Sequence, residues 1–437
     1  MARTALLRGG ALVVASTAVW HCSNFAFNAV GARFLGPTQY GVLAASISLL
    51  YLVSPVIISI QTVASREATA SRAAGEWVQL RHRLSRVGAR LGLSSAVAAA
   101  VLAGLSPQVS KFLRIGSPLP VVLTALALPL LAVTHLQRGV LQGIQRFGRY
   151  AASTVTEALS KLLAALLLFG LLWRNPAAGT LSVLVAAGCG LVVNVMLLRF
   201  LPKGKIEGRV ARTSSRYSAT VLATLVLLAL LMSEDILVAK RYLDPHAAGL
   251  YAGVSIVGKI VFFATSTLSL ILFPIFSARH EAGRDSRAGL VAALGLVAGG
   301  ACLLALVFFT APELVLTPLL GGSFAAAEPY LGWMGIAFAL YAMTHLVATY
   351  LLAQRRANVV AVLAVVALLQ VVGFWSFHGG ILQLIHVLIA TFAVAATALM
   401  GVALLFRPPA TTRLDERHLV EAGSGDELQL SRAVASG

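Results

Sequence analysis

Two lysines inside long apolar runs are the residues of this sequence best suited to chemistry. Lys161 lies in YAASTVTEALSKLLAALLLFG and Lys259 lies in GVSIVGKIVFFATS. If such runs cross a membrane, a charge at the centre costs about 2.5–3.5 kcal/mol on insertion scales, so each ammonium must face protein, water or a ligand. Together the two lysines would form a cationic surface that suits an anionic group such as phosphate.

The acids near these lysines define a competing interpretation. Glu157 precedes Lys161 by one helical turn, so the two residues can neutralise each other. This ion pair and a role for both residues in a cavity stay open. Lys259 has no acid in its own run, so its partner is either an anionic ligand or an acid on another helix, such as Glu234 or Asp235. These last two acids could also couple an ion.

A polar stripe marks the first apolar run. Four polar residues recur there at spacings of four, three and four: Thr17, His21, Asn24 and Asn28. This spacing places them on one face of a helix. Small polar residues often hydrogen-bond to neighbouring helices in membranes, but four residues in register over three turns favour a water-lined surface.

The composition identifies the elements that must position these residues. The 437-residue chain is 58% hydrophobic and 11% charged, whereas soluble domains are roughly one quarter charged. Apolar runs of about twenty residues, long enough to cross a ~30 Å hydrocarbon core, alternate with short arginine-rich connections. The sequence therefore predicts an all-α polytopic membrane protein with about twelve transmembrane helices. They cover residues 11–32, 38–60, 91–109, 118–137, 150–173, 178–198, 217–239, 247–276, 289–310, 329–353, 358–376 and 381–405.

The net charge of +18 follows from the same arrangement. With the N-terminus inside, 26 of the 34 lysines and arginines fall in inner segments, six in outer segments and two within the runs. This asymmetry is the positive-inside rule, which places both termini in the cytoplasm. The basic residues therefore do not indicate nucleic-acid binding.

One phrase of the sequence occurs twice. ARFLGPTQYGVLAASI begins at residue 32, and RYLDPHAAGLYAGVS repeats its pattern 208 residues after Arg33. Residues 134–136 and 344–346 both read THL, at nearly the same offset, so the chain is a tandem duplication. Six runs per copy predict two parallel six-helix lobes related by a pseudo-two-fold axis along the membrane normal. The phrase then lies at the outer mouth, where Arg33 and Arg241 could attract an anion or snorkel to lipid phosphate.

The predicted organisation has two lobes and a tail. Residues 1–205 form the N-terminal lobe and residues 206–406 the C-terminal lobe. Residues 407–437 lose the apolar periodicity, which predicts a disordered cytoplasmic tail. The sequence has no P-loop, dinucleotide-binding, zinc-protease or hydrolase motif, and its three cysteines lack metal or disulfide spacing. We therefore expect no catalytic residue, no metal, no cofactor and no enzymatic activity.

Three segments carry a resemblance to a known family: GARFLGPTQYGVLAA, DILVAKRYLDPHAAGLYAGVSIVGKIVFFA and PELVLTPLLGGSFAAAEPYL. With the runs around them, over nearly all of residues 10–405, they resemble the polysaccharide exporters (Wzx-type flippases) of the multidrug/oligosaccharidyl-lipid/polysaccharide (MOP) superfamily. The resemblance implies the MATE/MOP fold and a bacterial inner-membrane flippase that moves a polyprenyl-diphosphate-linked oligosaccharide by alternating access. It also implies a central cationic cavity, where Lys259 and Lys161 meet the diphosphate or acidic sugars.

The partners and the alternative functions follow from the same resemblance. A polysaccharide polymerase and glycosyltransferases are the implied partners. The alternative is a MATE-like antiporter of drugs or metabolites, coupled to protons or sodium, which needs a carboxylate-centred ion site. Only Glu157, Glu234 and Asp235 qualify for that site. A major facilitator also has parallel six-helix halves, but its GxxxDRxGR-like loop is missing after the second run. Coupling to protons, sodium or the membrane potential stays open.

Overall fold

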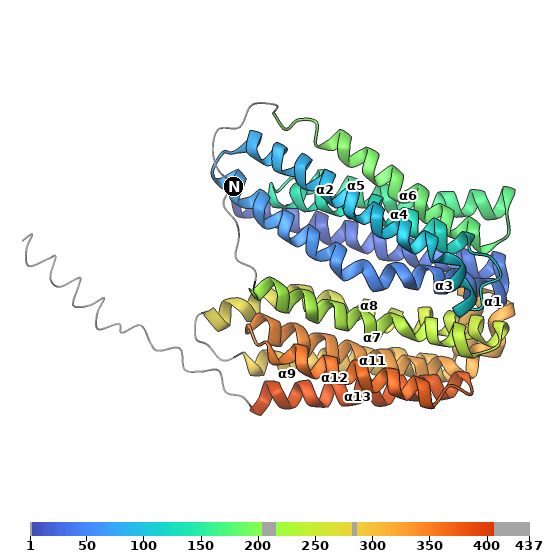
Figure 1. The fold of residues 1–437 in the computed structure, drawn as a ribbon. Helices are drawn as coiled ribbons and strands as arrows, with labels where there is room; N and C mark the ends of the chain where they lie inside the picture. Colours follow the sequence, from blue (N-terminus) through green and yellow to red (C-terminus); the bar gives the residue numbers. More distant parts are fainter. Residues whose placement is uncertain (1, 203–215, 282–285, 406–437) are drawn as a thin grey trace, which may run out of the picture.

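The computed structural model describes residues 2–202, 216–281 and 286–405, which contain helices and no strand (Figure 1). The N-terminal half contains α1 (Ala2–Ala73), α2 (Trp77–Gly104), α3 (Ser106–Phe112), α4 (Leu119–Gly143), α5 (Phe147–Leu167), the π-helical turn η1 (Leu168–Leu172) and α6 (Pro176–Leu197). The C-terminal half contains α7 (Arg216–Tyr242), α8 (Pro245–Glu281), α9 (Arg287–Thr310), α10 (Pro312–Leu320), the 3-10 turn η2 (Gly322–Ala327), α11 (Glu328–Ala353), α12 (Asn358–Ser376) and α13 (Ile381–Leu405).

Eleven helical segments of the described chain are long and apolar enough to cross a membrane. The first of them, Gly9–Ala73, is 65 residues long and contains two crossings. The predicted all-α membrane protein with twelve crossings is therefore confirmed. The predicted boundaries at residues 205 and 406 and the predicted tail lie outside the described residues.

The order of elements repeats between the two halves. In each half, two long crossings are followed by a third, a short helix and three further crossings, so that α3 and α10 occupy equivalent places. In Figure 1, α1 to α6 form one lobe and α7 to α13 form the other. The two lobes expected from the duplicated sequence are thus visible as separate bundles.

The two copies of the repeated phrase turn the chain in different ways. In α1 the only non-helical backbone is at Gly36, with φ 65° and ψ 173°, a conformation that favours glycine, and Pro37 follows it. In the second copy the chain breaks between α7 and α8 at Asp244. Its carboxylate accepts hydrogen bonds from the backbone N–H groups of His246 and Ala247, both at 3.0 Å, and so caps α8.

The predicted basic loop between the second and third crossings is wrong in extent. The second crossing continues as helix to Ala73, and α2 already begins at Trp77. Only residues 74–76 separate the two helices. The two helices therefore continue beyond the apolar runs, and the arginines assigned to this loop lie on these extensions. Their side chains can reach water there, while the backbone keeps its helical hydrogen bonds.

The lobes touch backbone to backbone at the repeated phrase. A Cβ atom placed on Gly249 would lie 1.8 Å from the carbonyl oxygen of Pro37, and one placed on Gly41 would lie 3.0 Å from the Gly249 Cα atom. Next to this contact, the ring of Tyr40 meets the ring of Phe324 edge-on, with centroids 5.8 Å apart. From this end the helices of the two lobes diverge toward the N-terminus of the chain (Figure 1).

We expect Gly249→Ala to weaken this contact between the lobes. The added methyl group has no room beside Pro37, and overpacking of this kind costs about 1–3 kcal/mol. The midpoint of thermal unfolding in detergent should fall by a few degrees. Gly188→Ala in α6 is the matched control, because nothing lies within 4 Å of its added Cβ atom. An equal effect of both substitutions would contradict the close contact.

Candidate functional site

Lys161 is the centre of a polar group at mid-depth of the N-terminal lobe. It lies about 21 Å along α5 from Phe147, at 1.5 Å per residue. Its ammonium donates a hydrogen bond to Asn24 Oδ1 on α1 and lies 4.9 Å from the centre of the Phe27 ring. Among the described residues, no carboxylate lies within 4.0 Å of this ammonium. Lys161 therefore lies in the membrane-spanning region without a direct ion-pair partner in the described part of the chain.

The predicted stripe on α1 supplies the surroundings of Lys161. The Asn28 amide donates to the backbone carbonyl of Asn24 at 2.8 Å, and its Oδ1 accepts from the Tyr40 hydroxyl at 3.3 Å. One turn before Asn24, the ring of His21 lies 4.9 Å from the ring of Phe263 on α8. We call His21, Asn24, Asn28 and Lys161 the α1–α5 polar cluster. Because His21 contacts α8, this cluster borders the seam between the lobes.

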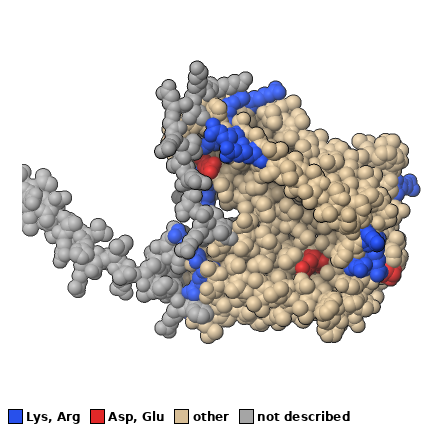
Figure 2. All heavy atoms as spheres, in the orientation of Figure 1, with Lys and Arg blue, Asp and Glu red and all other residues tan. Residues whose placement is uncertain are grey.

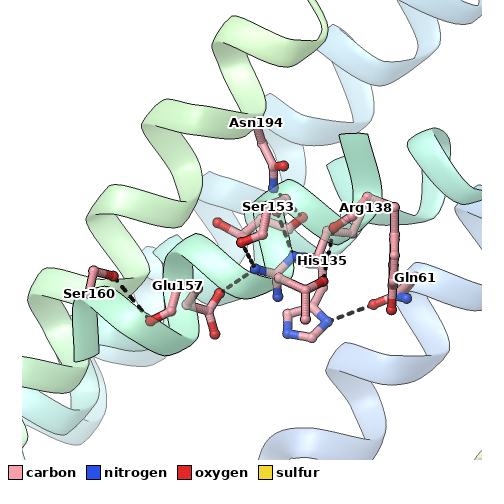
Figure 3. A network of polar contacts seen from close by, with 10 residues as sticks. Gln61, His135, Arg138, Ser153, Glu157, Ser160 and Asn194 are labelled. Atoms are coloured by element: carbon pink, nitrogen blue, oxygen red, sulfur yellow. Dashed lines mark hydrogen bonds and ion pairs between the residues drawn. The ribbon is translucent and has the colours of Figure 1, made fainter. Parts of the chain in front are cut away.

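Glu157 does not pair with Lys161 in this structure. Its carboxylate lies 2.9 Å from the guanidinium of Arg138 on α4, and Arg138 also donates to Ser153 Oγ at 2.8 Å and to the Ser153 carbonyl at 2.9 Å. Figure 3 shows these side chains converging between α4 and α5. Arg138, expected in a cytoplasmic connection, is only 2% exposed. Of the two alternatives left open for Glu157 and Lys161, a direct ion pair between them is not found among the described residues, because an arginine on the neighbouring helix contacts the same carboxylate.

Neutral hydrogen bonds extend this ion pair to the rest of the lobe. Asn194 on α6 donates to the Thr134 carbonyl at 3.2 Å, and His135 Nδ1 lies 2.8 Å from Gln61 Oε1 on α1 (Figure 3). Helices α1, α4, α5 and α6 are thus connected by buried polar contacts. Such a network fixes the packing of the helices but leaves no charge to bind a ligand.

Lys259 is held inside the C-terminal lobe by Asp235. Its ammonium lies 3.6 Å from Asp235 Oδ1, and both side chains are buried. Asp235 Oδ2 also accepts hydrogen bonds from Ser255 at 2.6 Å and from Tyr251 at 3.3 Å. Of the two alternatives left open for Lys259, the acid on another helix is therefore the one found. Lys259 therefore does not add an unpaired positive charge to the expected cationic surface, because Asp235 balances its charge.

Glu234 faces away from this ion pair. Its side chain is 8% exposed, it makes no ion pair within the described part of the chain, and its Oε1 atom is buried without a hydrogen-bond partner. Although it is adjacent to Asp235 in the sequence, the helix directs the two carboxylates to different neighbours. Glu234 is therefore a second buried titratable group without an ion-pair partner among the described residues, and it lies outside the α1–α5 polar cluster.

The two arginines of the expected outer mouth each reach the opposite lobe. The Arg33 guanidinium donates to the carbonyl of Pro318 on α10. The Arg241 guanidinium lies 5.1 Å from the centre of the Phe112 ring, at the end of α3. Both therefore contact the short helix of the other repeat. These contacts support the closed seam at this end; anion attraction there stays a prediction.

Arg138 is a buried charged residue whose place the sequence did not reveal. The one feature of the sequence that pointed to a buried position is that Arg138 follows His135, in the repeated residues 134–136, by one helical turn on α4. The predicted end of that crossing fell one residue before Arg138, so its charge was assigned to water. Ser153, Tyr251 and Ser255 were also missed, since no spacing rule links a hydroxyl to a charge on another helix.

We expect Arg138→Met to destabilise the protein strongly, since Glu157 would remain buried without its partner. Removing one member of a buried ion pair costs about 3–5 kcal/mol, whereas replacing both members is often neutral. The double variant Arg138→Met/Glu157→Leu should therefore recover most of the lost thermal stability in detergent. If the two single losses simply add in the double variant, the pairing is not the cause.

Comparison with protein families identifies most of the chain. Residues 30–329 match the family model described as "Polysaccharide biosynthesis protein". The match begins in the first crossing and ends at the start of α11, so it includes the α5 lysine, both ion pairs and both copies of the repeated phrase. Comparison with curated protein sequences gives no match.

Solved structures share the fold at low sequence identity. The structure titled "Lipid II flippase MurJ, inward closed conformation" is 10% identical with a TM-score of 0.67, and the match covers 89% of this chain and 87% of that one. An inward-facing multidrug resistance MATE transporter of the MOP superfamily is 11% identical with a TM-score of 0.65, with coverage of 88% and 93%. An outward-facing MATE transporter is 12% identical with a TM-score of 0.61, with coverage of 92% and 94%. The chain therefore has the two-lobed MOP fold.

Proposed function

Because the chain belongs to the polysaccharide biosynthesis protein family, we propose that it is a flippase. Its substrate is an oligosaccharide linked to a polyprenyl diphosphate, and its membrane is the bacterial inner membrane. The multi-pass MOP fold supports this proposal, and one of the proteins with that fold is titled a lipid II flippase. A polymerase and glycosyltransferases that act on the same lipid-linked sugar are the proposed partners.

Lys161 is the observation that carries the proposal. A diphosphate that crosses the bilayer needs a cation that is not already held in an ion pair, and among the described residues no carboxylate lies within 4.0 Å of the Lys161 ammonium. Asn24 and Asn28 add amide groups of the kind that hydrogen-bond phosphate and sugar hydroxyls. Since His21 of the same cluster contacts α8, a headgroup bound here would lie beside the seam. The cationic path is then built by the N-terminal lobe rather than by both lobes.

The contact between the lobes suggests how the substrate is loaded. The lobes meet at the repeated phrase and diverge toward the N-terminus of the chain. With the termini in the cytoplasm, this arrangement favours entry of the headgroup from the cytoplasmic side. Release on the other side requires the repeated phrases to separate. The lipid tail stays in the bilayer while the polar headgroup passes along the seam.

The antiporter alternative has less support from the acids in the crossings. Glu157 pairs with Arg138 and Asp235 pairs with Lys259, so each carboxylate already has a cationic partner with which a coupling ion would compete. Glu234 remains, but it lies outside the α1–α5 polar cluster. Coupling of the flippase to protons, sodium or the membrane potential remains part of the proposal.

We expect Lys161→Met to slow flipping at least tenfold in proteoliposomes that contain a fluorescent polyprenyl-diphosphate oligosaccharide. A hydrogen bond to a charged group contributes about 1.5–3 kcal/mol, and about 1.4 kcal/mol corresponds to tenfold. Lys161→Arg should keep part of the rate. Lys111→Met, which removes an exposed lysine from α3, is the matched control.

Two results would reject this function. Flipping by Lys161→Met at the wild-type rate would remove Lys161 from the substrate path. Drug efflux by the wild-type protein without any lipid movement would favour the antiporter. Thermal unfolding of each variant in detergent shows whether a lost rate reflects lost folding.

The proposed orientation predicts which loops face outward. Ser117, between α3 and α4, and Ala357, directly before α12, are both exposed. In intact cells, a membrane-impermeant maleimide should label Ser117→Cys and leave Ala357→Cys unlabelled until the membrane is opened, in a background without the native cysteines. The reverse labelling pattern would invert the topology.

A further inference from the structure

A small cavity lies at the outer end of α7, away from the α1–α5 polar cluster. Its volume is about 220 Å³. It is lined by two charged and four aromatic residues, Glu234, Arg241, Phe112, Tyr242, Phe374 and Trp375, and its remaining wall is aliphatic. Phe112 belongs to the N-terminal lobe, whereas the charged residues belong to the C-terminal lobe. The cavity therefore lies on the boundary between the lobes.

Glu234 provides the acidic end of this cavity. It is more than nine-tenths buried, and its Oε1 atom has no hydrogen-bond donor. A buried carboxylate without a partner is costly, and a hydrogen bond from a cation removes that cost. Within the part of the chain that the structure describes, no base lies within ion-pair distance of Glu234. Figure 2 shows that most of the face it draws is uncharged, with few acidic side chains among the described residues.

Arg241 provides the basic end. It follows Glu234 by seven residues, or two helical turns, so the two residues share one face of α7 about 10 Å apart along the axis. Its guanidinium lies 5.1 Å from the ring centre of Phe112 and 6.0 Å from that of Tyr242. Within the described residues this guanidinium makes no hydrogen bond or ion pair, so its N–H groups can bind an anion. The cavity thus presents an acid and a base at a separation that suits a zwitterion.

The mouth of the cavity faces the bilayer. Trp375 is 72% exposed and Phe112 is 59% exposed. Large exposed aromatic side chains at the end of a crossing are typical of the membrane–water interface. A ligand can therefore enter from the lipid, with its polar group between Glu234 and Arg241 and its chains outside.

We propose that this cavity binds the headgroup of an aminophospholipid with a free primary amine. The ammonium donates hydrogen bonds to Glu234, and the phosphate accepts them from Arg241. The aromatic rings exclude water and stabilise the ammonium through cation–π contact. Because Phe112 and Arg241 come from different lobes, the bound lipid would lie across their boundary on the side of the repeated phrase.

Lipid retention by the purified full-length protein tests this site without any measurement of transport. The protein is incubated with an equal mixture of phosphatidylethanolamine and phosphatidylcholine, and the lipids that remain bound are counted by native mass spectrometry. The two lipids share the phosphate and the net charge, but only the first has N–H groups to donate. We expect about a tenfold preference for phosphatidylethanolamine in the wild-type protein.

Two variants connect the preference to the cavity. Glu234→Gln should abolish it, whereas Glu313→Gln, at an exposed carboxylate on α10, should leave it unchanged. Equal retention of both lipids by the wild-type protein would overturn the proposal, as would an unchanged preference in Glu234→Gln. If Glu234→Gln does not fold, the comparison of the two lipids on the wild-type protein still decides.

Discussion

The close approach of two backbones at the repeated phrase is the constraint on which the arrangement of the lobes depends. The Pro37 carbonyl occupies the place that a side chain on Gly249 would need, and Gly41 meets the same segment from the other lobe. A Cβ atom on Gly249 would force the backbones apart, and one on Gly41 would be in tight contact, so glycine in both copies of the phrase allows this approach. Arg33 and Arg241 can then reach across the seam to α10 and α3. The duplication of the sequence thus has a structural role, since the two copies form one contact.

Charge is balanced within each lobe rather than between the lobes. Arg138 and Glu157 pair inside the N-terminal lobe, and Asp235 and Lys259 pair inside the C-terminal lobe. Breaking such a pair in a low-dielectric interior costs several kcal/mol, and no motion of one lobe against the other requires it. The lobes can therefore move as units without breaking either ion pair. Lys161 and Glu234 make no ion pair within the described residues, and Lys161 lies next to the seam.

The sequence was sufficient to predict the crossings because hydrophobic length and arginine placement depend on the membrane and not on helix packing. It was insufficient for the partners of the charges. Lys161 is one turn from Glu157, yet it is Arg138 on another helix that pairs with the Glu157 carboxylate. Which side chains face each other depends on how two helices are rotated about their axes, and a single sequence carries no signal for that rotation. Boundaries uncertain by a few residues also placed Arg138 in water. The sequence offered both Glu234 and Asp235 as partners of Lys259, and only the structure shows that Asp235 is the one that pairs with it.

The two turns of the repeated phrase are not mechanically equivalent. In the first copy one glycine interrupts an otherwise continuous helix, and a 3.3 Å hydrogen bond from the Tyr40 hydroxyl to Asn28 Oδ1 joins the two sides of the break. In the second copy the Asp244 carboxylate is bonded to two backbone N–H groups of α8. A rotation that separates the lobes at this end would therefore change the backbone dihedral angles at Gly36. The Asp244 turn, which is held by two backbone hydrogen bonds, would move together with α8.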